Sequence, residues 1–132
     1  MARRVISVPG LGHGDQPIPL AVVLGPLLVT GGLSGRDPES GDLPEDLDAE
    51  VAQLFRNITA VLSAADSGPA AVAKVTVYVR DRGARDAINR EWVALFPDPE
   101  DRPVRHTLIH DLPGDLRVQA DLLAVLENKD HE

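Results

Sequence analysis

Residues 72–96, VAKVTVYVRDRGARDAINREWVALF, place a strand-like segment directly before a helix-like one. Val75, Val77 and Val79 alternate with polar side chains, and this period of two with β-branched residues is typical of a β-strand. From residue 81 to residue 96 the apolar side chains recur at helical spacing and form a stripe that can pack on a sheet. That stripe consists of Ala84, Ile88, Trp92 and Leu95. The two segments therefore predict a domain in which helices cover a β-sheet.

A second helix is predicted upstream, from Leu47 to a stop before Ser67-Gly68-Pro69. Asp46 is placed to cap its first turn, and Asp48 and Glu50 lie near the positive end of the helix dipole. The apolar stripe of this helix comprises Leu47, Val51, Leu54, Phe55, Ile58, Val61 and Leu62. This helix therefore has an apolar face that must pack on the same sheet.

The remaining apolar segments have the length and composition of strands. Residues 20–24 and 27–30 flank the turn signal Gly25-Pro26 and predict a hairpin, and residues 104–109 and 116–126 predict two later strands. Residues 31–41 are polar and rich in glycine, so we expect them on the surface or along a site.

The predicted order of elements is β-β-β-α-β-α-β-β. This order defines an α+β fold, with two helices on one face of a mixed sheet and a single domain over residues 1–132. The last strand becomes apolar on both of its faces from Leu122 to Leu126. Helices can cover only one of those faces, so we expect an oligomer to cover the other.

Composition narrows the classes of function. The chain carries a formal net charge of -8 and shows no cluster of Lys and Arg, which disfavours a nucleic-acid partner. It contains no cysteine, so thiolate chemistry is excluded and the reducing cytoplasm is the expected location. We expect no signal peptide, and no membrane span because Pro19, Gly25 and Pro26 interrupt the apolar residues 18–29.

One cation stands out in this acidic chain. Arg105 follows Pro103-Val104 and begins the predicted strand of residues 105–109. A guanidinium held on a strand can bind a small carboxylate through two parallel donors. The alternatives are an ion pair with an acid across the sheet, or a charge that faces solvent.

Taken in order, the sequence motifs resemble those of the Rid family, also called the YjgF/YER057c/UK114 family. The resemblance covers most of the chain, and six motifs occur at family-like spacing. They are residues 25–32 (GPLLVTGG), Gln53 with residues 57–62 (NITAVL), residues 74–81 (KVTVYVRD), residues 89–92 (NREW) leading to Phe96, Pro103-Val104-Arg105, and Leu112-Pro113.

This resemblance implies a chorismate-mutase-like (YjgF-like) fold and a homotrimer with its sites between subunits. It also implies hydrolysis of reactive 2-imino acids and their enamine tautomers to 2-keto acids and ammonia. An imine carbon already reacts with water unaided, so that chemistry requires orientation rather than a nucleophilic side chain, a metal or an organic cofactor.

The resemblance also assigns roles to individual residues. Arg105 would clamp the carboxylate of the imino acid, and Asp121, where the family often has glutamate, would position the attacking water. Thr107, where the family often has cysteine, and Gly31 and Gly32 would contribute mainly backbone contacts. Each assignment has a structural alternative: Asp121 could be a solvated carboxylate and the glycines a turn.

Asn89 matches a family asparagine near the site, or is a polar residue on the helix surface. The segment from Pro17 to Leu20 replaces an aromatic hydroxyl found in many family deaminases, so we expect a more apolar pocket near Leu20. His106 and His110 are interpreted as ordinary strand histidines rather than a metal site, and the glycines around His13 predict a mobile side chain.

Two other functions stay open. One is a non-catalytic module that binds a small carboxylate or a partner. The other is an enzyme of a specialised pathway that acts on a bulkier imine or enamine. Ribonuclease activity has little support in an acidic chain without a basic stripe.

Overall fold

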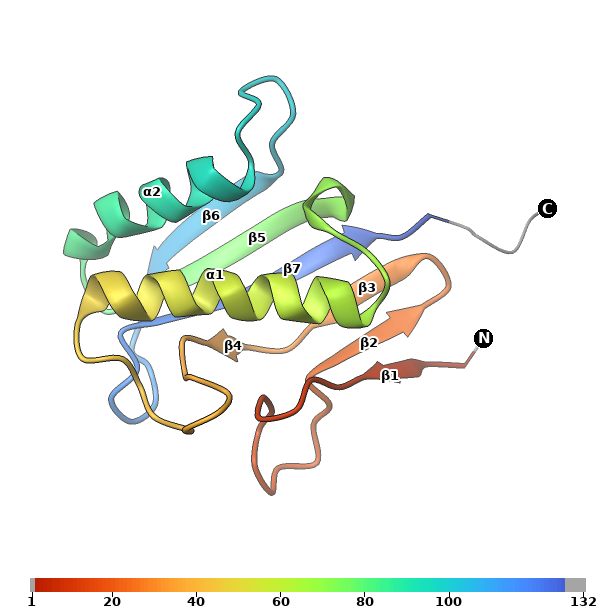
Figure 1. Ribbon diagram of the computed structural model, residues 1–132, viewed down its shortest axis with the longest axis horizontal. Coiled ribbons are helices and arrows are strands. Elements are labelled where there is room, and N and C mark those ends of the chain that lie inside the picture. The colour runs from red at the N-terminus through yellow and green to blue at the C-terminus, as the bar shows by residue number, and fades with distance from the viewer. Residues whose placement is uncertain (1, 128–132) are drawn as a thin grey trace.

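The computed structural model describes residues 2–127, in which two helices lie on one β-sheet (Figure 1). Short 3-10 turns at Pro69–Ala71 and Arg82–Ala84 precede β5 and α2. In chain order the elements are β1 (Arg4–Ile6), β2 (Ala21–Leu24), β3 (Leu27–Thr30), β4 (Leu33–Ser34), α1 (Leu47–Ala64), β5 (Val72–Val79), α2 (Arg85–Leu95), β6 (Val104–Ile109) and β7 (Val118–Val125).

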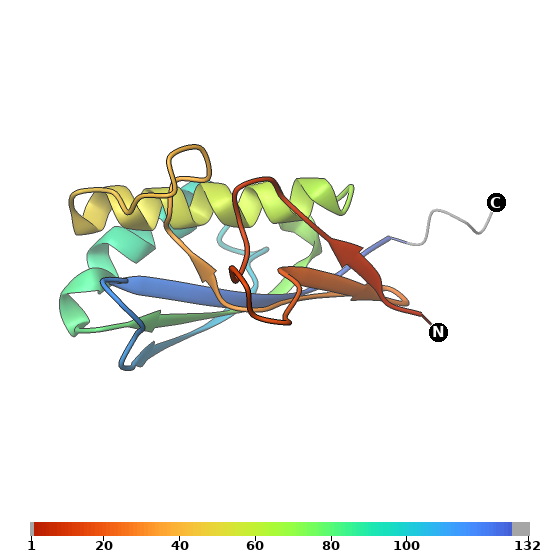
Figure 2. The same cartoon turned by 90° about the horizontal axis from the view of Figure 1, so that it is seen from below.

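The strands form one mixed sheet in the order β1-β2-β3-β7-β5-β6, and β4 also pairs with β7. Strands β5 and β6 run parallel, whereas the other pairs are antiparallel. Both helices lie on the same face of this sheet (Figure 2). The predicted α+β class and the helices on one face of a mixed sheet are confirmed.

The short strands β1 and β4 lie outside the strand ranges that the sequence predicted. Strand β4 lies within residues 31–41, which were expected on the surface or along a site, and its Leu33 is only 2% exposed. Leu33 pairs with Ala120 of β7 and joins the hydrophobic core. A two-residue strand has no period to detect, and its pairing partner lies far along the chain.

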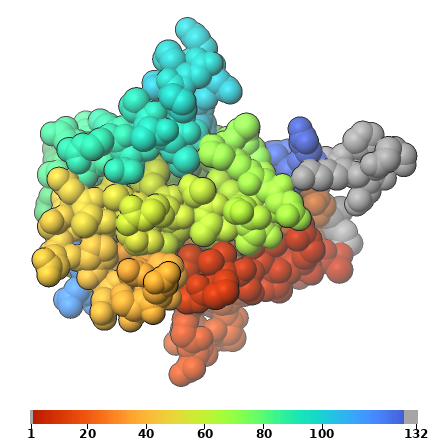
Figure 3. Space-filling model, in the orientation of Figure 1, coloured from red at the N-terminus to blue at the C-terminus, as the bar shows by residue number. Residues whose placement is uncertain are grey.

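The helix predicted from Leu47 is confirmed, together with its cap. The Asp46 Oδ1 atom accepts a hydrogen bond of 2.8 Å from the backbone N–H of Ala49. The apolar stripe of α1 packs into the core, and the helices with the segment before α1 cover most of the sheet on this face (Figure 3).

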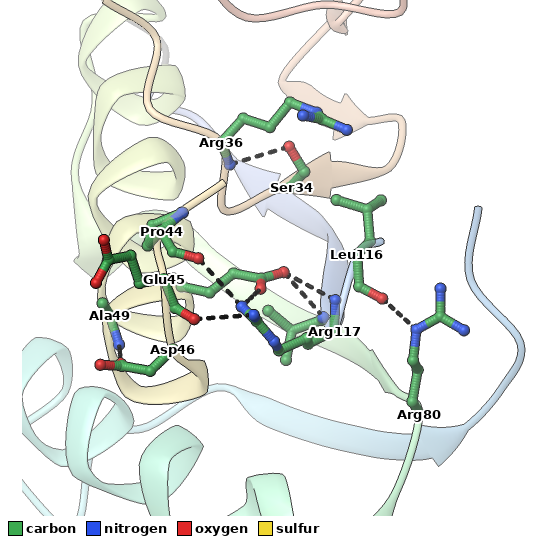
Figure 4. A network of polar contacts seen from close by, with 11 residues as sticks. Ser34, Arg36, Pro44, Glu45, Asp46, Ala49, Arg80, Leu116 and Arg117 are labelled. Atoms are coloured by element: carbon green, nitrogen blue, oxygen red, sulfur yellow. Dashed lines mark hydrogen bonds and ion pairs between the residues drawn. The ribbon is translucent and has the colours of Figure 1, made fainter. Parts of the chain in front are cut away.

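Glu50 has a different role from the predicted interaction with the helix dipole. Its side chain is fully buried, and its Oε1 atom lies 2.6 Å from Nη1 of Arg117. Its Oε2 atom accepts the backbone N–H of Arg117 at 2.9 Å. The Arg117 guanidinium also donates to the backbone carbonyls of Pro44 and Glu45 (Figure 4). The pair therefore joins the first turn of α1 to the start of β7.

The opposite face of the sheet carries exposed apolar side chains. Leu27 pairs with Val125 and Val29 pairs with Leu123 across β3 and β7, and all four side chains are at least 36% exposed. We name these four residues the apolar strip. Within residues 2–127 no helix combines the length and the apolar composition needed to cross a membrane.

Candidate functional site

Arg105 lies on the helix-facing side of β6, at one edge of the sheet. It is opposite Val75 in the parallel β5–β6 pairing, and Val75 is buried beneath the helices. The Arg105 Nη2 atom donates a hydrogen bond of 2.6 Å to Oδ1 of Asn89 on α2. Its guanidinium carbon lies 4.9 Å from the ring centroid of Trp92, which is three residues further along the same helix face. Strand β6 and helix α2 therefore hold the guanidinium from two directions.

The charge of this guanidinium has no acidic partner among residues 2–127, because its neighbours are an amide and an indole. Burial, and then the positive charge of Arg85, lower the pKa of Arg105 below its usual value. The Nη1 atom is buried and lacks a hydrogen-bond partner within the described chain. The first alternative, an ion pair with an acid, is therefore not what this part of the chain forms. A guanidinium in this arrangement can bind an anion.

Thr107 lies two residues further along the same face of β6. Its strand partner is the buried Val77, and its Oγ1 atom is also buried without a hydrogen-bond partner in residues 2–127. Buried polar atoms in folded proteins are nearly always hydrogen-bonded. Two unsatisfied groups on one strand face, Nη1 of Arg105 and Oγ1 of Thr107, therefore mark a position suited to ligand oxygens. Arg105, Thr107 and Asn89 form the first group of site residues.

Gly31 and Gly32 lie elsewhere in the sheet, in the connection between β3 and β4. Val29 pairs with Leu123 and Leu33 pairs with Ala120, so residues 30–32 face residues 121–122 of β7. Because three residues of this connection face only two residues of β7, the chain forms a bulge here. Asp121 is one of the two β7 residues that the bulge faces. The Gly31 N–H donates to the backbone oxygen of Leu20 at 3.0 Å. Leu20, Gly31, Gly32 and Asp121 form the second group of site residues.

Side chains that the sequence analysis did not select pack against both glycines. A Cβ atom on Gly31 would lie 2.9 Å from Nε2 of His13, and one on Gly32 would lie 2.6 Å from Nε2 of Gln119. His13, Gln119, Gly32 and Leu20 line a cavity of about 270 Å³. The predicted mobile histidine is instead placed against Gly31. The cavity near Leu20 has a mixed lining, because an imidazole and an amide lie among apolar side chains such as Leu11 and Leu116.

The loop between β6 and β7 forms the rim of this cavity, to which it contributes Gly114 and Leu116. Arg80, at the end of β5, donates to the backbone oxygens of Leu112 at 2.8 Å and Gly114 at 2.6 Å. It also donates through Nε to the Leu116 oxygen (Figure 4). The motif arginine Arg80 therefore holds the loop in place rather than contacting a ligand.

Asp121 lies on the sheet face opposite to the helices. Its strand partner Thr76 alternates with the buried Val75 and Val77, whereas Arg105 faces the helices. The pKa of Tyr78 is raised, chiefly by the interaction of its hydroxyl with the Asp121 carboxylate and to a smaller extent by burial. Asp121 and Arg105 thus occupy opposite faces of the same sheet.

One chain does not bring the two groups together. Strands β7 and β5 separate β3 from β6, and three strand spacings amount to about 14 Å. A small 2-imino acid has its carboxylate directly attached to the imine carbon, so it cannot reach both groups within one chain. Among residues 2–127 there is no cluster of three or more His, Asp and Glu side chains arranged to hold a metal ion.

The fold and these motifs define a class of small α+β domains, and comparisons with known proteins identify it. A family model described as Endoribonuclease L-PSP matches residues 18–126. The structure of RidA from the Antarctic bacterium Psychrobacter sp. superposes with a TM-score of 0.85 at 26% identity, covering 93% of this chain and 99% of that one. This chain belongs to the Rid family, as the sequence motifs predict.

Two proteins of this family are similar to the chain over most of their length. A RutC family protein of Aquifex aeolicus is 31% identical over 123 residues, covering 92% of this chain and 98% of the relative. A 2-iminobutanoate/2-iminopropanoate deaminase of Salmonella typhimurium is 29% identical over 111 residues, covering 83% of this chain and 87% of that enzyme.

Proposed function

We propose that this protein hydrolyses 2-imino acids and their enamine tautomers to 2-keto acids and ammonia. The observation that carries this proposal is the Arg105 guanidinium, which Asn89 and Trp92 hold with one buried nitrogen unsatisfied. Such a group can bind the carboxylate of a 2-imino acid through charge-assisted hydrogen bonds. The similarity to a protein named as an imine deaminase favours this substrate over other small carboxylates.

The reaction is balanced without a further reagent. Water adds across the C=N bond, the oxygen joining carbon and a proton joining nitrogen, and the resulting amino alcohol expels ammonia as the C=O bond forms. An enamine first takes a proton on its β-carbon and loses one from its nitrogen, which converts it to the imine. Arg105 would fix the carboxylate, Thr107 and the backbone at Gly31 and Gly32 would orient the reacting carbon, and Asp121 would accept a hydrogen bond from the water.

The site would be completed between chains. Arg105 and the bulge at Gly31 are too far apart in one chain for a small substrate, whereas a second copy could bring its own bulge to the first copy's β6. The apolar strip favours such association, because exposed apolar side chains on a sheet face are stabilised by burial. A homotrimer with three equivalent sites satisfies both observations, and the family resemblance implies the same assembly.

A direct assay tests the proposed function. An amino-acid oxidase generates 2-iminobutanoate or 2-iminopropanoate in situ, and ammonia release and imine loss are followed with and without the protein. We expect faster imine loss with the wild-type protein, and an increase that falls at least about 100-fold in R105A. Equal rates with and without protein, for small and for bulky imines, would refute the proposal.

The same protein preparation distinguishes the binding-only alternative. A keto acid such as 2-oxobutanoate, the hydrolysis product of 2-iminobutanoate, would then raise the melting temperature without any turnover of imines. The bulkier-imine alternative predicts a preference for large side chains. The cavity volume of about 270 Å³ favours small substrates instead.

A further inference from the structure

His13 lies in the loop between β1 and β2, which also contains Gly12 and Gly14 in positive-φ conformations. Its ring packs against the Cα atom of Gly31, where a Cβ would lie 2.9 Å from Nε2. Gly31 is not among the glycines with positive φ, so its backbone alone would accept alanine. The space that Gly31 leaves empty is therefore the space that the imidazole occupies.

The Nε2 atom of His13 is buried and has no hydrogen-bond partner among residues 2–127. Buried polar atoms in folded proteins nearly always have a hydrogen-bond partner, so such an atom is unusual unless something else binds it. His13 lines the cavity shared by Leu20, Gly32 and Gln119, all beside the bulge assigned to the substrate. Arg36 is the one charged residue that lines this cavity with it.

We propose that His13 is a further catalytic residue of the imine site, whose Nε2 atom contacts the substrate nitrogen and transfers its proton. This inference rests on the proposed deaminase function. In the amino alcohol, the imidazolium gives a proton to the nitrogen as the C–N bond breaks. The proton of the hydroxyl oxygen returns to the imidazole as the C=O bond forms, so the histidine ends the cycle unchanged.

Three features favour an imidazole for this step. A histidine both donates and accepts protons near neutral pH, whereas the amide of Gln119 does neither. The residues from Pro17 to Leu20 contribute no hydroxyl that could take this role. Asp121 has its carboxylate engaged by the Tyr78 hydroxyl, which suits it to orient water rather than to protonate an amine.

Kinetics of two variants test the proton transfer. In H13A, kcat for 2-iminobutanoate should fall about 100-fold, while the Kd for 2-oxobutanoate changes less than about threefold because Arg105 is intact. H13Q should be as slow as H13A, since glutamine can hydrogen-bond but cannot transfer a proton. Added imidazole should restore activity to H13A in proportion to its concentration. A wild-type kcat in H13Q would overturn the proposal.

Gly31 provides a matched test of position. In G31A the new Cβ should displace the ring and lower kcat by about tenfold or more, but G31A should add little to H13A because the ring is already gone. If the losses of kcat in G31A and H13A are fully additive, Gly31 does not act by positioning the His13 ring. Gln16→Ala, an exposed change in the same loop, is the control and should leave kcat unchanged.

A binding measurement separates the two proposals. The ring signals of His13, assigned by their loss in H13A, should shift when 2-oxobutanoate is titrated into the wild-type protein. If the wild-type protein does not accelerate imine loss but these signals shift, the deaminase function fails and the ligand contact stands. If imines are hydrolysed while H13A keeps the wild-type kcat or the ring does not respond, the inference about His13 fails alone.

Discussion

Asn89 holds Arg105 through an uncharged acceptor: its Oδ1 atom lies 2.6 Å from Nη2 of the guanidinium. An amide at this position fixes the orientation of the guanidinium but leaves its positive charge uncompensated. A carboxylate in the same place would fix it equally well and neutralise it. The difference between these two residue types therefore decides whether β6 can bind an anion.

Asn89→Asp tests this relationship with almost no change in shape. We expect the Kd for 2-oxobutanoate to rise about 100-fold, because the introduced carboxylate competes with the ligand for the same guanidinium. Asn89→Ala, which removes the hydrogen bond without adding charge, should weaken binding by about tenfold. Isothermal titration calorimetry measures both constants. A Kd for N89D equal to that for N89A would contradict the anion role of Arg105.

Arg105→Lys should introduce a pH dependence that the wild-type protein lacks. Burial disfavours the charged form and lowers the pKa of Arg105, but an arginine starts so far above neutrality that it stays protonated at neutral pH. A lysine starts from about 10.4, and the same burial would lower its pKa toward the neutral range. Binding of 2-oxobutanoate by R105K should therefore weaken between pH 6 and pH 9, in a titration series where the wild-type Kd is constant. If the Kd of R105K and that of the wild-type protein vary with pH in the same way, the site around residue 105 is not desolvated.

The sequence predicts those elements whose apolar residues recur with the spacing of a strand or a helix. Alternation in residues 72–79 and the helical stripe from Leu47 both report burial directly, so β5 and α1 were expected near their observed bounds. The two residues of β4 show no period. The role of Glu50 depends on Arg117, which lies far along the chain, and a carboxylate in a first helical turn suits a dipole interaction equally well.

The motifs indicated the candidate residues of the site but not their arrangement. Arg105 and Gly31 are separated by strand order, which depends on how β7 inserts between β3 and β5 rather than on any local pattern. His13 was missed for a related reason. Its surroundings in sequence are glycines, whereas its contact in space is Gly31. Local composition therefore predicted mobility where tertiary packing buries the Nε2 atom of the ring.

The ion pair between Glu50 and Arg117 should dominate the stability of the α1–β7 contact. Removing the guanidinium in R117A leaves a fully buried carboxylate, which we expect to lower the free energy of unfolding by about 3 kcal/mol. The double variant E50Q/R117M should recover part of this loss because no unpaired charge is left. Urea denaturation followed by circular dichroism measures both changes. A loss below about 0.5 kcal/mol in R117A would place the pair among weak surface bridges.

The apolar strip should hold the oligomer together. Leu123→Lys places a charge beside Val29 on the sheet face away from the helices, and we expect it to convert the oligomer to monomers. Its deaminase activity should fall at least about tenfold although Arg105 and His13 are unchanged, because each site would lack one of its two groups. Light scattering gives the mass, and Glu127→Lys near the end of the described chain is a control that also introduces a lysine. A fully active L123K monomer would contradict a site shared between chains.

Mixing two inactive variants tests the shared site most directly. R105A lacks the carboxylate clamp, and Gly31→Val blocks the bulge with a side chain that meets the His13 ring. If Arg105 of one subunit works with Gly31 of the next, a trimer assembled from both variants contains some intact sites. In these sites the Gly31→Val subunit supplies Arg105 and the R105A subunit supplies Gly31. Random assembly at equal concentrations gives about one quarter of the wild-type number of intact sites. The mixture, unfolded together and refolded, should therefore recover about a quarter of the wild-type activity, whereas each variant alone and the doubly substituted chain stay inactive. A mixture as inactive as its components would contradict a site shared between neighbouring subunits.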